Sequence, residues 1–369
     1  MDCTRGALEG VALNRGFWNG RRVFLTGHTG FKGSWLLLML RELGAEVHGF
    51  SLPPPTEPSL FNLLELQTAC RHRTGDIRDF SSLEAALQES RAEIVLHLAA
   101  QPLVRASYDS PVDTYATNVM GTVHLLDACR RLQSLKAAVV ITTDKCYENH
   151  GWLWGYREND RLGGADPYSN SKAACELVVD AYRRSFFNPE AHGRHGVAIA
   201  SARAGNVIGG GDFAVDRLVP DAIKAFMAGE PLQIRNPLSV RPWQHVLEPL
   251  YGYLLLAERL HDSASFGGGW NFGPQTDESA PVSAVADALA ELWGDGAEWR
   301  QDPLEHPHEA ATLKLDSTKA RIELGWRPQF SLHEALVHTA NWYKALSRRD
   351  NLRELTSEQV SSYLKQANA

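Results

Sequence analysis

Short apolar runs alternate with longer amphipathic segments over the first part of the chain. Residues 22–27 (RVFLTG) suit a buried strand, 34–44 (SWLLLMLRELG) have helical length and end in glycine, and 45–52 (AEVHGFSL) suit a second strand. The alternation continues with predicted strands at 72–77, 92–100 and 137–143 and predicted helices at 81–90 and 114–132. Repeated strand-helix units with apolar strands predict an α/β fold with a doubly wound parallel sheet that helices cover on both faces.

Composition narrows the classes of function. The chain has 369 residues, and its net charge of −7 is spread without long runs of one sign, so we expect neither nucleic acid nor a membrane surface as partner. The five cysteines form no CxxC pair, which favours reduced thiols over disulfides or a metal site. The apolar run SWLLLML is far shorter than the roughly 20 residues of a membrane span. The sequence thus predicts a cytoplasmic protein without membrane or metal partners.

A glycine-rich turn, GHTGFKG, joins the first predicted strand to the first predicted helix. Gly27, Gly30 and Gly33 would allow a tight turn in which backbone N–H groups approach a pyrophosphate, as in dinucleotide-binding Rossmann domains; the alternative is an ordinary turn. Ser51 ends the second strand where such sites often have an acid, and no arginine follows closely, which favours NAD over NADP. Asp76 could hydrogen-bond the adenine or cap the next helix.

Two groups of polar residues suggest acid-base chemistry. Tyr168 and Lys172 are four residues apart in YSNSK, so on a helix they would share one face, and the lysine would lower the pKa of the phenol. Thr143 ends the predicted strand at 137–143, and Asp144 and Lys145 directly follow it. An exposed helical pair is the alternative for the YxxxK motif, but its position downstream of the glycine-rich turn and the TTDK strand end favours a catalytic role.

GxxGxxG, LAAQ (98–101), TTDK and YSNSK together resemble the extended short-chain dehydrogenase/reductase superfamily, and within it the nucleotide-sugar 4,6-dehydratases. GHTGFKGSW, TTDKCYEN, RAGNVIGGGD, RPWQHVLEPL, WNFGP and LKLDSTKARIELGWRP are most similar to the CDP-glucose group of that family, over nearly the whole chain. This resemblance implies a lyase that uses bound NAD to convert CDP-glucose to CDP-4-dehydro-6-deoxyglucose. It also implies deoxysugar biosynthesis, as for the O-antigen of lipopolysaccharide.

The resemblance also implies roles for the acid-base residues. Tyr168, helped by Lys172 and Thr143, would take the proton of the carbon-4 hydroxyl, and Asp144 would protonate the departing carbon-6 hydroxyl. Lys145 occupies a position where related dehydratases usually have the glutamate that acts at carbon 5. It would act as a base or stabilise the enolate, unless it merely pairs with Asp144.

Further contacts follow from the same motifs. The expected cofactor contacts are Gly27, Thr29, Gly30, Phe31, Lys32, Gly33, Ser51, Asp76, Ile77, Leu98, Ala99, Ala100, Asn118, Tyr168 and Lys172. The expected substrate contacts are Gln101, Asn206, Arg217, Leu218, Pro220, Arg235, Arg241, Asn271 and His308. His245 is expected to be structural. Trp152 and Trp154 would either close over the sugar or pack their loop against the core.

The predicted domains are an NAD-binding domain at 20–202 with a returning segment near 240–270, a nucleotide-sugar-binding domain at 203–239 and 271–350, and a C-terminal tail at 351–369. The family commonly forms homodimers, so a homodimer or higher oligomer is expected. Three alternatives remain: a 4,6-dehydratase of another nucleotide sugar, a nucleotide-sugar 4-epimerase, and a non-catalytic NAD-binding sensor. Asp144 and Lys145 argue against the epimerase, which has no need of an acid after Thr143.

Overall fold

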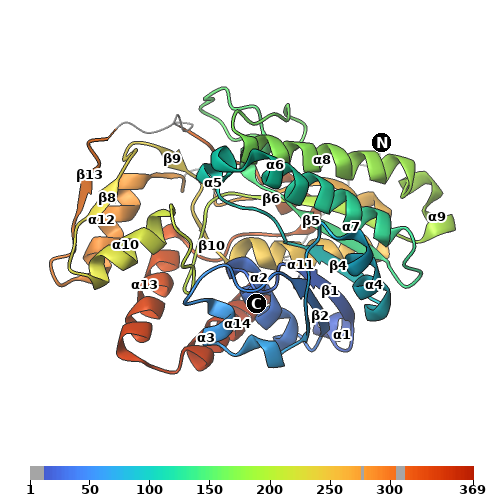
Figure 1. Ribbon diagram of the computed structural model, residues 1–369, viewed down its shortest axis with the longest axis horizontal. Coiled ribbons are helices and arrows are strands. Elements are labelled where there is room, and N and C mark those ends of the chain that lie inside the picture. The colour runs from blue at the N-terminus through green and yellow to red at the C-terminus, as the bar shows by residue number, and fades with distance from the viewer. Residues whose placement is uncertain (1–11, 276–277, 305–311) are drawn as a thin grey trace.

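A seven-stranded parallel sheet forms the centre of the computed structural model, which describes residues 12–275, 278–304 and 312–369 (Figure 1). The strand order is β11-β6-β5-β4-β1-β2-β3, so the chain winds outward in both directions from β1 and confirms the doubly wound α/β fold. The strands are β1 (Arg22–Thr26), β2 (Glu46–Ser51), β3 (Arg71–Thr74), β4 (Ile94–His97), β5 (Ala137–Ile141), β6 (Ala198–Ala204) and β11 (Gly268–Phe272).

Successive side chains of a strand point to opposite faces of the sheet, so both faces of the sheet carry apolar side chains and helices cover both. In β1, Val23 and Leu25 belong to the core shared with α2 (Phe31–Glu42) and α11 (Leu247–Asp262), whereas Phe24 belongs to a second core. The helices around the second core are α4 (Phe80–Ser90), α7 (Gly121–Cys129) and α8 (Pro167–Ser185).

The helix predicted at 114–132 is interrupted in the structure. α6 (Pro111–Tyr115) leads through a π-helical turn, η2 (Ala116–Met120), into α7. The other short helices are α1 (Arg15–Trp18), α3 (Leu60–Leu63), α5 (Val104–Asp109) and α9 (His192–His195), and the 3-10 turns are η1 (Leu66–Thr68), η3 (Asp144–Cys146), η4 (Pro189–Ala191) and η5 (Ala264–Phe266).

A smaller group of elements lies beside the carboxyl ends of the strands, at the left of Figure 1. It contains α10 (Leu218–Met227), α12 (Val282–Trp293) and α13 (Leu332–Arg348), whereas a second π-helical turn, η6 (Ala320–Leu324), packs against α11 and β11. Its paired strands are β8 (Leu232–Ile234) with β13 (Trp299–Gln301), β9 (Val240–Arg241) with β12 (Ala280–Pro281), and β7 (Val207–Ile208) with β10 (Gln244–His245). One continuous apolar core joins these elements to the α2 side of the sheet, and the division into two domains stays a proposal.

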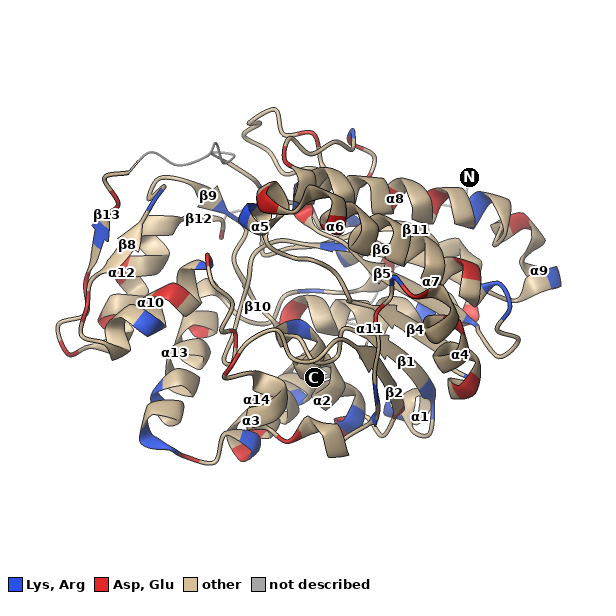
Figure 2. Ribbon diagram, in the orientation of Figure 1, with Lys and Arg blue, Asp and Glu red and all other residues tan. Residues whose placement is uncertain are grey.

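The last residues pack as a helix, α14 (Leu352–Ala367), against the α2 side of the sheet. Tyr363 donates a hydrogen bond to Glu248 at the start of α11 over 2.6 Å, and Val360 and Leu364 join the core. The helices of the described part of the chain are too short or too polar to cross a membrane. Figure 2 shows acidic and basic residues interspersed over the ribbon.

Candidate active site

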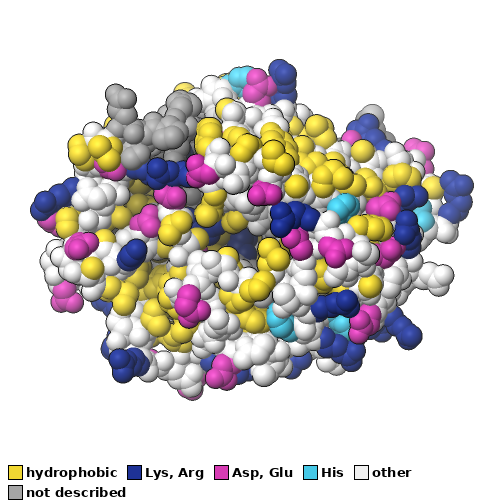
Figure 3. All heavy atoms as spheres, in the orientation of Figure 1, with side chains coloured by type: hydrophobic (Ala, Val, Ile, Leu, Met, Phe, Trp, Pro, Cys, Tyr) yellow, Lys and Arg dark blue, Asp and Glu magenta, His cyan; other side chains and the backbone are white. Residues whose placement is uncertain are grey.

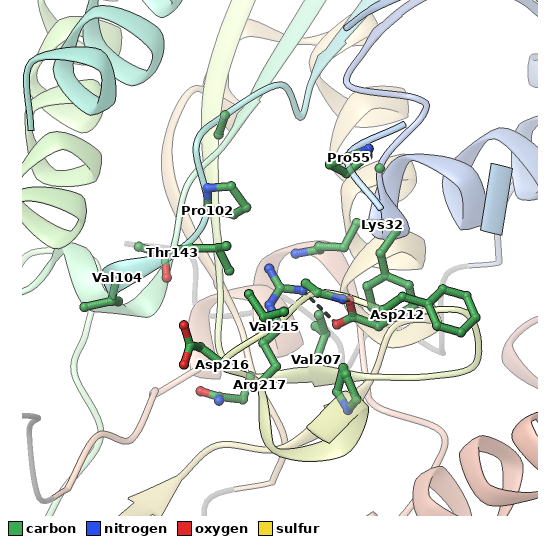
Figure 4. A pocket seen from close by; sticks show the side chains of 18 of the residues that line it. Lys32, Pro55, Pro102, Val104, Thr143, Val207, Asp212, Val215, Asp216 and Arg217 are labelled. Carbon is green, nitrogen blue, oxygen red and sulfur yellow. Dashed lines mark hydrogen bonds and ion pairs between the residues drawn. The ribbon is translucent and has the colours of Figure 1, made fainter. Parts of the chain in front are cut away.

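A cavity of about 670 Å³ opens beyond the carboxyl ends of the central strands. The glycine-rich turn, the ends of β2, β4 and β5, and the start of α8 form one side, and residues 204–221 and 232–243 form the other. The molecular face drawn in Figure 3 is hollowed near its centre, and Figure 4 shows side chains from both sides pointing into this space. Doubly wound sheets bind ligands at this edge.

The glycine-rich turn fits a dinucleotide pyrophosphate. Gly27 has φ +74°, and a Cβ there would lie 2.6 Å from the backbone N of Ala99. A Cβ at Gly33 would lie 2.1 Å from the carbonyl oxygen of Gly27, so both positions require glycine. α2 begins at Phe31, within the motif and directly after Gly30, and the first turn of a helix presents N–H donors and a positive dipole end to an anion.

Residues at the far end of the turn suit the adenosine part of such a ligand. The hydroxyl of Thr29 lies 2.8 Å from that of Ser51 and donates to the carbonyl of Leu52 over 2.9 Å. Asp76 lines the cavity and binds the Arg78 guanidinium over 2.6 Å, and this hydrogen bond lowers its pKa. The capping alternative for Asp76 is wrong, because the side chain that caps α4 is that of Asp79.

Asp144 is placed as a buried acid at the end of β5. Its side chain is 2% exposed, and its Oδ1 accepts a hydrogen bond from the Thr143 hydroxyl over 3.0 Å. Oδ2 is buried without a hydrogen-bond partner among the described residues. Burial raises the pKa of Asp144, and the nearby charge of Lys145 and the Thr143 hydrogen bond oppose that rise only in part. The carboxyl is therefore suited to hold and donate a proton.

Tyr168 and Lys172 lie on the first two turns of α8, which Asp166 caps and Pro167 starts. Lys172 Nζ donates to the carbonyl oxygen of Ile141 over 3.2 Å. The expected lowering of the phenol pKa is wrong for this structure, because burial raises the pKa of Tyr168 to about 12 while a hydrogen bond with Thr143 opposes the rise. Desolvation outweighs the nearby charges here.

The three arginines that were predicted as substrate contacts, Arg217, Arg235 and Arg241, line the wall of the cavity opposite the glycine-rich turn. Figure 4 shows Arg217 pointing into the cavity, and its Nη1 pairs with Asp212 Oδ2 over 2.8 Å. Arg235 Nη1 lies 3.5 Å from Asp216. Cations at this wall suit a nucleotide diphosphate. Asn206, Leu218 and Pro220 also line the cavity.

Three predicted ligand contacts, Gln101, Asn118 and Asn271, do not line the cavity. Their side chains form hydrogen bonds with other parts of the protein instead. Asn118 accepts from the backbone N of Gln101 over 2.8 Å, and Gln101 Nε2 donates to Thr114 over 2.9 Å, so both shape the loop after β4. Asn271 Nδ2 donates to the carbonyl oxygens of Tyr156 and Asp316. His308 lies outside the described residues. The remaining predicted contacts with described structure line the cavity.

The tryptophan-rich loop also lies outside the cavity wall. Trp152 stacks between His150 and Tyr156 and packs against the buried cluster around Tyr147, which favours the packing role for this residue. Trp154 is 58% exposed and fills neither predicted role here. His245 is buried against Trp35, in keeping with a structural role.

The sequence did not reveal where Lys32 points. Its Nζ donates to the Tyr253 hydroxyl over 3.1 Å, and burial, Lys172 and Arg217 lower its pKa to about 7. The charge of Asp144 raises the pKa of Lys32 and so opposes this lowering. Lys32 therefore lies close enough to Asp144 and Lys172 for their charges to interact. Its position inside the glycine-rich motif had indicated only a cofactor contact.

Comparison with known families decides the relationship. The family described as GDP-mannose 4,6 dehydratase matches residues 24–339. The chain belongs to this dehydratase family. A CDP-glucose 4,6-dehydratase from Salmonella typhimurium is 52% identical over 353 residues, which cover 95% of this chain and 98% of that protein. A dTDP-glucose 4,6-dehydratase from Streptomyces antibioticus is 30% identical over 275 residues, covering 73% of this chain and 75% of the relative.

Solved structures agree with the dehydratase fold. A double mutant of a dTDP-glucose 4,6-dehydratase from Streptomyces venezuelae, with NAD bound, has a TM-score of 0.75 and 25% identity and covers 89% of this chain and 98% of its own. A UDP-glucose 4-epimerase from Thermotoga maritima has a TM-score of 0.76 and 24% identity, covering 88% and 99%. Dehydratases and epimerases thus share this fold, and the fold alone does not separate the two reactions.

Proposed function

We propose that this chain is an NAD-dependent CDP-glucose 4,6-dehydratase, which converts CDP-glucose to CDP-4-dehydro-6-deoxyglucose. The observation that carries the proposal is the convergence of Thr143, buried Asp144, Tyr168 and Lys172 on one cavity with a dinucleotide cradle. The Salmonella typhimurium relative supports CDP-glucose as the substrate, since the likeness covers nearly all of both chains.

The proposed site for NAD lies along one side of the cavity. Gly27, Gly30 and Gly33 would let the pyrophosphate approach the start of α2, and Thr29 and Ser51 would face the adenosine ribose. NAD⁺, when bound, supplies a hydride acceptor beside the sugar and returns the hydride at the end of the reaction, and its positive nicotinamide favours an ionised phenol nearby.

The phenol of Tyr168 is the proposed base for the carbon-4 hydroxyl. Burial raises the pKa of Tyr168 to about 12 even though the Thr143 hydrogen bond opposes the rise, so the phenol needs a further positive charge nearby to act as a base. Lys172, one turn further along α8 and itself buried, would hold the ribose and supply that charge.

Asp144 is the proposed acid for the second half of the reaction. Oxidation at carbon 4 makes the proton at carbon 5 acidic, and loss of the carbon-6 hydroxyl then needs a proton donor. Asp144 Oδ2, buried and without a protein partner among the described residues, is suited to that transfer. Lys145 lines the same cavity beside it. It would either take the carbon-5 proton as a base or, as an ammonium group, stabilise the enolate formed at carbons 4 and 5 while water takes that proton.

The assembly and the setting are proposals as well. Exposed apolar side chains on α5, α6, η2 and α8, among them Tyr108, Val112, Met120 and Leu177, would form a homodimer interface. The cytoplasmic setting rests on the cysteines, whose spacing favours reduced thiols. A role in deoxysugar biosynthesis for lipopolysaccharide O-antigen rests on the motif resemblance, and the two-domain division is a proposal too.

The experiment incubates the purified full chain with NAD⁺ and CDP-glucose in deuterated water. The expected product has a 4-keto group, a 6-methyl group and deuterium at carbon 5, with no net NADH. dTDP-, UDP- and GDP-sugars run in parallel. Turnover of one of these in place of CDP-glucose would overturn the base preference, inversion at carbon 4 without loss of water would indicate an epimerase, and no turnover would leave a cofactor-binding sensor.

A further inference from the structure

A buried ion pair lies directly behind the catalytic groups. Glu176 follows Lys172 by one turn of α8, so Tyr168, Lys172 and Glu176, at intervals of four residues, share one helix face. Its carboxylate lies 2.7 Å from Arg203 Nη2 of β6, and the two side chains are only 3% and 5% exposed. Neither residue lines the cavity.

The carboxylate of Glu176 holds the end of the catalytic strand. Its Oε1 accepts from the Thr142 hydroxyl, and its Oε2 accepts from the Ser201 hydroxyl over 2.5 Å as well as from Arg203. Thr142 stands between Ile141, whose carbonyl oxygen accepts from Lys172, and Thr143, whose hydroxyl bonds with Tyr168. The Glu176 carboxylate therefore holds Thr142, whose two neighbours in the chain contact Lys172 and Tyr168.

Arg203 extends this hydrogen-bond network from the end of β5 to the segment that follows Asp144. Its Nη1 donates to the Tyr147 hydroxyl over 2.6 Å and to the carbonyl oxygen of Glu158 over 3.2 Å. Tyr147 in turn donates to Asn271 Oδ1 over 2.7 Å, so the segment after Asp144 is tied to β11. This network accounts for Asn271 without a substrate contact.

We propose that Glu176, held by Arg203, is a positioning residue of the dehydratase: it fixes the strand end that bears Thr143 and Asp144, and it keeps the Lys172 ammonium group charged. The proposal rests on the proposed function. A buried ion pair adds little net stability compared with apolar residues of similar size, so stability alone gives no reason for one at this place. Buried and fully paired polar networks do restrict geometry, which catalysis at a strand end requires.

The charges around Lys172 agree with this role. Burial lowers the pKa of Lys172, and Cys175, Glu176 and Cys146 oppose that shift. Burial would raise the pKa of Glu176, but Arg203 and the hydrogen bonds outweigh it, so Glu176 is ionised at neutral pH, whereas burial raises the pKa of both thiols. The titratable and charged groups that interact electrostatically with Lys172 are Lys32 of α2, His97 of β4, Cys146 of η3, and Cys175 and Glu176 of α8. Glu176 is thus the anion among these at neutral pH.

The test compares Glu176→Gln with wild type in the presence of NAD⁺ and CDP-glucose. The substitution keeps the size of the side chain and removes its charge. We expect kcat to fall by about tenfold or more with KM nearly unchanged, because substrate contacts stay in place while the reacting groups lose their alignment. Without the carboxylate the pKa of Lys172 drops further, so the alkaline limb of the kcat profile moves to lower pH.

Two variants separate positioning from stability. Thr142→Val removes the strand-end contact without leaving a charge unpaired, and should lower kcat without moving the alkaline limb. Glu248→Gln alters another buried carboxylate, at the start of α11, and should lower the melting temperature while the pH profile stays that of wild type. A Glu176→Gln enzyme that loses stability but keeps both the wild-type kcat and the wild-type profile would overturn the proposal.

Hydrogen exchange provides a readout that does not need turnover. Amides of residues 139–147 should exchange faster in Glu176→Gln and Thr142→Val than in wild type or Glu248→Gln. If wild type converts no nucleotide sugar, the proposed function fails, and faster exchange still supports the strand-end contact. Unchanged exchange in both variants would overturn that contact whatever the substrate proves to be.

Discussion

Replacing Asp144 with asparagine should stop the loss of water while it leaves the earlier chemistry in place. The amide keeps an oxygen for the Thr143 hydroxyl, which donates to Asp144 Oδ1 over 3.0 Å, so the strand end should keep its structure. What is lost is the proton that a buried carboxyl with a raised pKa can deliver from Oδ2. General acid catalysis contributes about 10²- to 10⁴-fold, so the barrier should rise by about 2.7 to 5.4 kcal/mol.

Deuterated water provides the assay for this variant. Because oxidation at carbon 4 and proton loss at carbon 5 do not require Asp144, CDP-glucose recovered from Asp144→Asn should carry deuterium at carbon 5, while 6-deoxy product forms at the reduced rate. Asp316→Asn, outside the cavity wall, is the matched control and should behave as wild type. An Asp144→Asn enzyme that makes product at the wild-type rate would refute the assignment of the acid.

The pH dependence of wild type follows from the same carboxyl, and three further substitutions test the site. Because Asp144 must be protonated and burial raises its pKa, kcat should fall as pH rises through that value. This fall should vanish in Asp144→Asn, while the separate alkaline limb that Lys172 sets should remain. Tyr168→Phe should lower kcat by about 10²-fold or more while calorimetry finds CDP-glucose binding unchanged; retained activity would exclude the phenol as base. Gly27→Ala, at φ +74°, should lower the free energy of unfolding in urea by about 1 to 3 kcal/mol, and no change would refute the close approach. Arg217→Lys should raise KM about tenfold with kcat nearly constant, and an unchanged KM would remove Arg217 from the diphosphate site.

The sequence predicted the parts of the fold that depend on local pattern. Apolar strands and the glycine-rich turn follow from burial on both faces and from conformations open to glycine, and both are found. The π-helical turn at η2 was missed because its sequence, ATNVM, has no helix-breaking residue. The helix predicted from residue 34 begins at Phe31, since the chain passes from the turn directly into α2.

The structure places individual residues as predicted where a motif fixed the geometry, and differs where the surroundings of the side chain decided. Tyr168 and Lys172 share a helix face by their spacing, but burial, which the sequence does not reveal, sets the pKa of the phenol. Asn271 was assigned from a motif that does not tell which way its side chain points. Glu176, eight residues after Tyr168, had a readable signal in the continued four-residue spacing, which was overlooked.

In the proposed mechanism, Asp144 is the residue that would distinguish a dehydratase from an epimerase on this fold. Both reactions need the dinucleotide cradle, a base for the carbon-4 hydroxyl and space for a 4-keto sugar, so Gly27, Tyr168 and Lys172 suit either. An epimerase then returns the hydride to carbon 4 and has no leaving group to protonate. A buried carboxyl oxygen without a protein partner is costly unless it carries a proton or meets a ligand. In the proposed dehydration the Asp144 carboxyl would carry a proton and deliver it to the departing carbon-6 hydroxyl, whereas carbon-4 epimerisation has no step that uses this proton.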